Sequence, residues 1–161
     1  MSERRAGGGV MVAAVVCAAF VAGALAIARR HRAASPAPPG WNEGAAGLAA
    51  AERESGATRA PMLVYFHTEW CGYCKRLERD LLPAPAVERA LAGAVKVRLD
   101  PERSPDERAI ADRYGVRGYP SLFLERAGRR VRLRPFTPSA GGWKQLTPAE
   151  FAAQLDSAAN P

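Results

Sequence analysis

Apolar and polar residues along this chain follow two different periods, and each change of period predicts a boundary between a strand and a helix. Short apolar runs and strict alternation predict strands at residues 62–67, 94–99, 121–125 and 130–134. Apolar residues three or four positions apart predict helices at residues 42–56, 71–82, 87–91, 105–114 and 148–155. This order of elements predicts an α/β fold, with a mixed sheet covered by helices on both faces.

Capping residues mark several helix starts. Asn42 is expected to cap the first helix, and Ser104 the helix before Gly115, with Glu107 at the capping-box position. Thr147 is expected to play the same part for the last helix.

The last two strands are expected to form a hairpin through Ala127 and Gly128. The second of them carries three arginines that alternate with apolar residues: Arg130, Arg132 and Arg134. That alternation predicts the solvated face of an edge strand, because a nucleic-acid site would need interleaved aromatic residues. Residues 136–145 are expected to form a long loop, which either shapes partner choice or packs the single Trp143.

A different pattern fills the beginning of the chain. The run from Val10 to Ala28 is apolar throughout and has arginines on both sides, which predicts a membrane segment. It is either an uncleaved signal anchor or a cleaved signal peptide, since it contains Ala-x-Ala sites. We therefore expect residues 1–32 to be this anchor or signal peptide with its basic flanks, 33–41 a proline-rich linker, and 42–161 the folded domain.

The formal net charge of +7 is concentrated near the membrane segment. Residues 1–32 contain five arginines and one glutamate, which leaves 18 basic and 15 acidic residues, a net charge of +3, for the remainder. That balance is typical of an ordinary soluble surface and predicts no nucleic-acid partner. We expect a monomer on the extracytoplasmic, periplasmic side, although the arginine count around the run mildly favours the opposite orientation.

The candidate chemistry lies at the second predicted helix. The segment Trp70-Cys71-Gly72-Tyr73-Cys74-Lys75 places Cys71 in the first turn and Cys74 one turn further in. A helix N-terminus stabilises an anion, so Cys71 is expected to be an exposed, acidic and reactive thiol. Cys74 is expected to be more covered and close enough to form a disulfide with it.

A zinc site is the main alternative for two cysteines at this spacing. Tetrahedral zinc needs two further ligands, and the chain offers only Cys17, His31 and His67. We expect neither a metal nor another cofactor.

The segment Glu69 to Lys75 resembles the active site of the thioredoxin superfamily, and Tyr114 to Ser121 resembles that superfamily's cis-proline segment. The resemblance extends from Pro61 to Asp156 and implies the thioredoxin fold. It implies that Pro120 is cis and that the backbone of Tyr119 pairs with an extended substrate. The groove would be formed by Trp70, Gly72, Tyr73, Tyr119 and Pro120.

The chain departs from thioredoxin at some positions. Tyr65 stands where thioredoxins have a buried aspartate, so Lys96 lacks its usual partner and the proton acceptor for Cys74 is open. Tyr65, His67 and Lys96 are the candidates for tuning the cysteines, although His67 also fits a simple hydrogen-bonding role. The active-site helix is similar to thioredoxin-like domains of membrane-bound disulfide-reducing systems.

The resemblance implies a thiol-disulfide oxidoreductase that reduces disulfides of extracytoplasmic proteins through Cys71 and Cys74, with a membrane protein as a candidate electron donor. A disulfide oxidase or isomerase would use the same residues. A non-catalytic alternative is a copper-binding or adaptor module, because a thiolate pair suits Cu(I).

Overall fold

The computed structural model describes residues 38–160 and contains a central five-stranded sheet with the strand order β1-β3-β2-β4-β5. The five strands are β1 (Trp41–Glu43), β2 (Met62–Phe66), β3 (Val95–Leu99), β4 (Ser121–Arg126) and β5 (Arg129–Leu133). The helices are α2 (Gly44–Thr58), α3 (Gly72–Arg76), α4 (Pro85–Ala90), α5 (Pro105–Arg113) and α6 (Pro148–Ala159), with a π-helical turn η1 (Leu77–Leu81) after α3. The predicted strands and helices are therefore all present, with boundaries shifted by a few residues.

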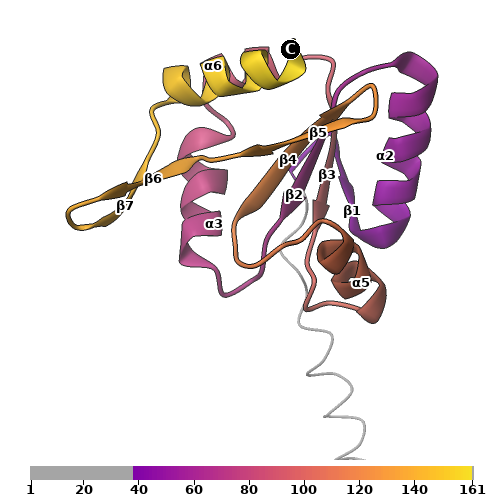
Figure 1. Cartoon of the computed structure of the whole chain (residues 1–161), viewed down its shortest axis with the longest axis horizontal. Helices are drawn as coiled ribbons and strands as arrows, with labels where there is room; N and C mark the ends of the chain where they lie inside the picture. The colour runs from indigo at the N-terminus through magenta and orange to yellow at the C-terminus, as the bar shows by residue number, and fades with distance from the viewer. Residues whose placement is uncertain (1–37, 161) are drawn as a thin grey trace, which may run out of the picture. The chain divides into compact units, whose positions relative to one another are not determined.

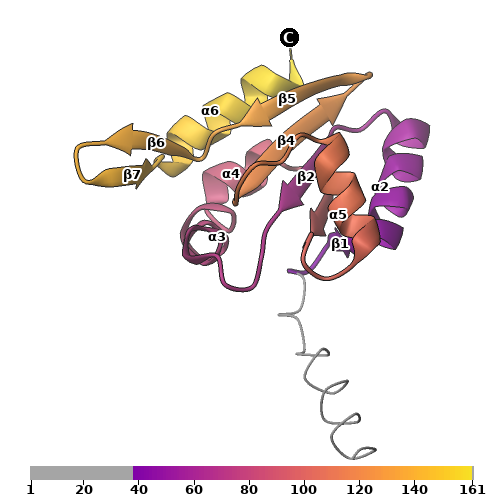
Figure 2. The same ribbon diagram turned by 60° about the horizontal axis from the view of Figure 1, so that its bottom comes forward.

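Helices cover both faces of the sheet, as Figures 1 and 2 show. In β2, Leu63 and Tyr65 join one apolar cluster with α3, α4 and α6, whereas Val64 and Phe66 join another with α2 and α5. All five residues of β2 are buried because the strand is covered on both sides. The alternation of a strand thus divides one short apolar run between two cores.

The sheet is mixed, as predicted. β2 runs parallel to β3 and antiparallel to β4. β4 and β5 form the predicted antiparallel hairpin, whose turn residues Ala127 and Gly128 have φ values of 50° and 78°. The parallel pair brings the carboxyl ends of β2 and β3 to the same edge of the sheet, where Cys71 follows β2.

The two later capping predictions are confirmed. The side chain of Ser104 accepts a hydrogen bond from the backbone of Glu107, and Thr147 and Glu150 form a complete capping box on α6. The carboxylate of Glu107 also accepts a bond of 2.7 Å from the backbone N–H of Asp100, so it ties α5 to the end of β3.

The predicted cap at Asn42 is wrong. Asn42 lies in β1, pairs in parallel register with Val97, and donates a side-chain bond of 3.2 Å to the carbonyl of Lys96. Trp41, assigned to the end of the linker, starts this strand. Helix α2 begins after Glu43, whose side chain makes no capping bond.

The predicted loop at residues 136–145 is a second hairpin, formed by β6 (Phe136–Ser139) and β7 (Gly142–Gln145). Its two strands pair with each other and belong to no other sheet. Trp143 is 55% exposed, so it is not a packed loop residue. The hairpin extends β5 beyond the body of the domain, on the side of α3 (Figure 1).

The predicted membrane segment, with Cys17 and His31, lies outside the described residues. Among residues 38–160, no helix has the length and apolar character needed to cross a bilayer.

Candidate active site

The two cysteines lie where β2 leads into α3. Cys71 is the N-cap of α3, and its Sγ accepts a bond of 3.0 Å from the backbone N–H of Cys74. The two sulfurs are joined in a disulfide of 2.06 Å, with the Cα atoms 5.2 Å apart. The predicted pair is therefore present as a disulfide across the first turn of the helix.

Cys71 is less exposed than its position in the first turn predicted. In this disulfide form Cys71 is 3% exposed and Cys74 is 1% exposed, because both join the apolar cluster beneath α3. The residues beside them are open to solvent: Trp70 is 66% and Tyr73 is 43% exposed. The buried disulfide is therefore flanked by two exposed aromatic rings.

The Tyr119–Pro120 peptide bond is cis, which is the geometry that the resemblance implied. The ring of Tyr119 contacts Trp70 edge to face, with 6.1 Å between ring centroids. The indole N–H of Trp70 also donates a bond of 2.9 Å to the carboxylate of Glu102, in the loop between β3 and α5. Glu102 thus fixes an exposed ring beside the disulfide, and no sequence motif pointed to it.

Three polar side chains, those of Tyr65, His67 and Glu78, form a partly buried cluster on the side of β2 that faces the disulfide. The hydroxyl of Tyr65 donates a bond of 2.9 Å to Glu78 Oε1, and His67 Nδ1 lies 3.9 Å from the same oxygen. The rings of Tyr65 and His67 stack with 5.4 Å between centroids. Two of the predicted tuning residues therefore meet at one carboxylate.

Glu78 was missed in the sequence, although its spacing from Cys74 was a usable signal. Residues four positions apart share one face of a helix, so the carboxylate follows Cys74 on the same side. Tyr65 and both cysteines also belong to one buried cluster. Glu78 is therefore a candidate acceptor for the proton of a cysteine. Its carboxylate is bound by Tyr65, the residue that stands where thioredoxins have an aspartate.

Burial shifts the pKa values of Tyr65 and His67 in this cluster. Loss of hydration raises the pKa of the Tyr65 hydroxyl, and the charge of Glu78 raises it further, so Tyr65 remains protonated and donates. Burial, together with the positive charge of Arg98, lowers the pKa of His67 from 6.5 to about 4. His67 is thus neutral at pH 7, and its Nε2 is buried without a hydrogen-bond partner in residues 38–160.

Lys96 lies on β3 opposite Leu63, so the sheet sets it two residues away from the level of Tyr65. Arg98 is the residue paired in register with Tyr65, and its guanidinium is bound to Glu43 at 2.9 Å. The structure therefore places Arg98, rather than Lys96, beside the polar group at Tyr65.

A cavity of about 490 Å³ opens beside the disulfide. Tyr73 and the segment Gly118 to Pro120 form one wall, and the hairpin β6–β7 contributes the other. Gly72 has open space around its α-carbon, so nothing in the described chain covers the start of α3 there. Trp70, Gly72, Tyr73, Tyr119 and Pro120, predicted to form the groove, are thus gathered around the cysteines and the mouth of this cavity.

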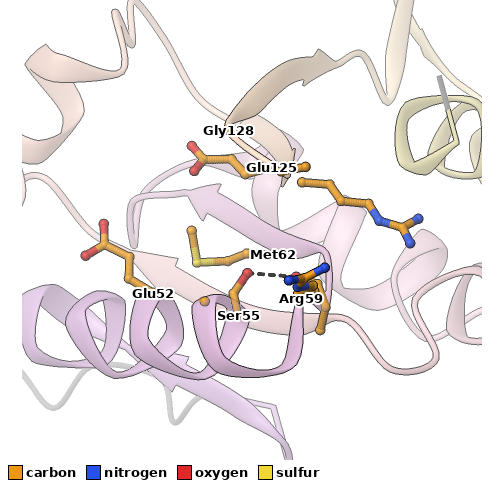
Figure 3. A pocket seen from close by; sticks show the side chains of 10 residues that line it. Glu52, Ser55, Arg59, Met62, Glu125 and Gly128 are labelled. Carbon is orange, nitrogen blue, oxygen red and sulfur yellow. Dashed lines mark hydrogen bonds between the residues drawn. The ribbon is translucent and has the colours of Figure 1, made fainter.

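A second cavity of about 600 Å³ lies at the opposite end of the sheet (Figure 3). It is lined by Met62 at the start of β2 and by Glu125 in the register position beside it. The Ser55 hydroxyl in its wall donates a bond of 2.7 Å to the carbonyl of Ala60. This cavity contains no thiol and is separated from Cys71 by the length of β2.

Between residues 38 and 160, no three side chains of histidine, cysteine, aspartate or glutamate are grouped so that they could hold an ion.

The chain matches the family model described as a thioredoxin-like domain over residues 48–158. It is 34% identical over 86 residues to a probable protein disulfide-isomerase A4 of Caenorhabditis elegans, a match that covers 53% of this chain and 14% of that protein. It is 30% identical over 100 residues to the thiol:disulfide interchange protein DsbD 1 of Pseudomonas aeruginosa, covering 62% of this chain and 15% of that protein. The chain thus corresponds to a small part of these longer relatives.

Solved structures show the same fold. The reduced C-terminal domain of DsbD from Neisseria meningitidis aligns with a TM-score of 0.59 at 23% identity, covering 73% of this chain and 98% of that domain. A thioredoxin from Thermus thermophilus aligns with a TM-score of 0.51 at 26% identity, covering 73% of this chain and 84% of that one. The match over residues 48–158 shows that this chain, with its disulfide between Cys71 and Cys74, belongs to the thioredoxin-like domain family.

Proposed function

We propose that this protein is a thiol-disulfide oxidoreductase that reduces disulfide bonds in extracytoplasmic partner proteins. The observation that carries the proposal is the Cys71–Cys74 disulfide at the start of α3, between the exposed rings of Trp70 and Tyr73. In a reductase of this kind the disulfide is the oxidised form of the pair, which must be reduced to the dithiol before each cycle.

The reaction begins with the reduced pair. The Cys71 thiolate attacks one sulfur of the partner's disulfide, which breaks that bond and forms a mixed disulfide between Cys71 and the partner. The other partner sulfur leaves as a thiolate and takes a proton from water. Cys74 then attacks the Cys71 sulfur, which releases the partner and forms the Cys71–Cys74 disulfide. The partner gains two electrons and the pair loses two.

The second step requires Cys74 to lose its proton. The carboxylate of Glu78 is the acceptor that we assign, because it lies one helical turn from Cys74 and is held by the Tyr65 hydroxyl. Neutral His67 beside the same oxygen adds no competing charge.

The N-terminal sequence supports the proposed location. We propose that residues 1–32 are a signal anchor or signal peptide, that 33–40 are a linker, since Trp41 belongs to β1, and that the domain acts on the periplasmic side as a monomer. The apolar run at residues 10–28 would put the domain beside a membrane protein that supplies two electrons and two protons to restore the dithiol.

Disulfide isomerisation is a second candidate, favoured by the protein disulfide-isomerases among the relatives. An isomerase would use the same attack by Cys71 but release the partner by a thiol of the partner itself. The two functions differ in the number of thiols that the partner gains and in the form of the pair after one turnover, which is oxidised in a reductase and still reduced in an isomerase.

Alkylation of intact cells with a membrane-impermeant thiol reagent tests location and redox state together. We expect Cys71 to be labelled without prior reduction, since a working reductase is kept reduced outside the cytoplasm. Labelling only after reductant is added would favour an oxidase, and labelling only after lysis would refute the extracytoplasmic location. Reduced protein mixed with an excess of a disulfide-bonded substrate should leave two thiols on the substrate, and an oxidised Cys71–Cys74 pair, for each molecule of protein. An isomerase would leave its own pair reduced and the substrate with no added thiols.

A further inference from the structure

The hairpin β6–β7 is joined to the active site by direct contact. Phe136 packs edge to face on Tyr73, with 5.2 Å between ring centroids. The backbone N–H of Leu146 donates to the carbonyl of Pro135 at 2.9 Å, which closes the base of the hairpin. The position of the hairpin beside α3 is visible in both orientations (Figures 1 and 2).

Exposed aromatic residues concentrate at this junction. Over the described part of the chain, the large apolar side chains that are exposed are Trp70, Tyr73 and Trp143. Tyr73 and Trp143 line the cavity of about 490 Å³, and Trp70 contacts Tyr119 at its rim. Exposed aromatic residues around a cavity are typical of protein-binding surfaces, where such rings carry much of the binding energy.

The same cavity has a basic wall. Arg132 and Arg134 both line it and both are exposed. The Arg132 guanidinium donates to Ser121 Oγ at 3.1 Å and lies 5.7 Å from the ring of Phe123, both uncharged groups. Within residues 38–160 neither Arg132 nor Arg134 forms an ion pair, whereas Arg130 on the same strand is bound to Glu125.

The cavity lies where β5 ends, and its lining follows the chain continuously from Arg132 to Pro138. β5 is the last strand in the order of the sheet, and the chain continues from it directly into β6. A groove between this continuous stretch of chain and the residues Tyr73 and Gly118 to Pro120 fits an extended segment, because such a segment presents alternate side chains to the two sides of the groove.

We propose that this groove binds an extended, acidic segment of the protein whose disulfide is exchanged, with an apolar side chain between Tyr73 and Trp143 and carboxylates at Arg132 and Arg134. The inference rests on the proposed function and names its substrate class. The guanidiniums of Arg132 and Arg134, which form no ion pair in the described residues, lie in the same lining as the rings of Tyr73 and Trp143 and complement the negative charge of such a segment. They also steer such a segment toward Cys71 over the distance at which charges act.

Peptide binding to the full-length oxidised protein tests this directly. Two synthetic peptides of the same length, with alanine in place of cysteine and with either two glutamates or two glutamines after an apolar residue, would be titrated while the indole signal of Trp143 is followed by NMR. We expect the acidic peptide to bind about fivefold more tightly at low salt, the effect of two partly exposed ion pairs, and the ratio to approach one at high salt.

Variants assign the effect to the groove. Arg132→Gln combined with Arg134→Gln should bring the ratio of the two affinities to about one, and the corresponding lysine variants should retain most of it. Arg129→Gln is the matched control, because Arg129 is exposed on the same strand but does not line this cavity. A ratio of one in the unaltered protein, or a ratio that the double variant leaves unchanged, would overturn the proposal. So would a double variant that changes the protein's own association state in light scattering but not peptide binding, because the groove would then hold a second copy.

A separate measurement keeps the two proposals apart. Reduced protein would be mixed in one reaction with 2-hydroxyethyl disulfide and in a second reaction with a disulfide-bonded form of the acidic peptide. Tight binding of the acidic alanine peptide without reduction of either disulfide would refute the reductase and leave the groove. Reduction of both without the difference in affinity would refute the groove and leave the reductase.

Discussion

His67 should make the folded protein lose stability in mild acid. Its side chain is 4% exposed, and burial together with the positive charge of Arg98 lowers its pKa from 6.5 to about 4. Between these two pH values the His67 side chain is protonated in the unfolded chain but neutral in the folded chain. The free energy of unfolding therefore falls as the pH falls. A shift of this size corresponds to about 2 kcal/mol lost between pH 7 and pH 5, and to about 3 kcal/mol by pH 4.

The variant His67→Phe isolates this effect, since it keeps a ring against Tyr65 and removes the titrating nitrogens. The free energy of unfolding in urea should be measured for both proteins at several values between pH 7 and pH 4. Buried carboxyls such as Asp100 and Glu107, whose pKa values burial raises, titrate alike in both and cancel in the difference. We expect the difference between the two curves to change by about 2 kcal/mol from pH 7 to pH 5. Parallel curves, or an NMR titration of the His67 ring with a midpoint near 6.5, would refute the assignment of a buried neutral histidine.

Three further predictions concern the pair and its support. Cys74→Ser should accumulate a mixed disulfide with a natural partner that survives non-reducing electrophoresis, whereas Cys71→Ser should form none, because only Cys71 makes the first attack. Glu78→Gln should lengthen the life of the mixed disulfide in the otherwise native protein by about 100-fold, the size of a lost general base, as followed by rapid acid quench. Phe151→Ala should lower the free energy of unfolding by about 3–5 kcal/mol in urea, because Phe151 is fully buried in the cluster beneath the cysteines.

Each of these predictions has a result that would contradict it. Equal trapping by both cysteine variants would mean that the two roles are misassigned. An unchanged lifetime in Glu78→Gln would show that water or another group takes the proton of Cys74. A loss below about 1 kcal/mol for Phe151→Ala would mean that α6 contributes little to the core on that face.

Most of the fold could be predicted because its signals are local. The apolar run of β2, the cap at Ser104 and the capping box at Thr147 depend on residues close together in the chain. β1 could not be predicted in this way, because three residues become a strand only through pairing with β3, more than 50 positions away. Because of that pairing, the Asn42 side chain binds the carbonyl of Lys96 and does not cap α2.

The candidate site was predictable to a similar extent. The cysteines and the Tyr119–Pro120 segment have recognisable sequences, so their approximate positions followed from motifs. Glu102 and Glu78 act through partners that are distant in sequence, Trp70 and Tyr65, and such contacts have no local pattern. The exposure of Cys71 was misjudged because position in the first turn sets the electrostatics of a thiol, whereas the neighbouring cluster sets its burial.

The ion pairs of Glu43, at the end of β1, limit where this chain can be cut. One oxygen of Glu43 binds both Arg98, which is 3% exposed, and Arg103, each at 2.9 Å. A protease that cleaved after Glu43, or an engineered fusion that started at Gly44, would withdraw that carboxylate from a buried guanidinium and expose one side of β3. A tether on this domain therefore has to end before Trp41, and any processing site that releases the domain intact must lie upstream of that residue.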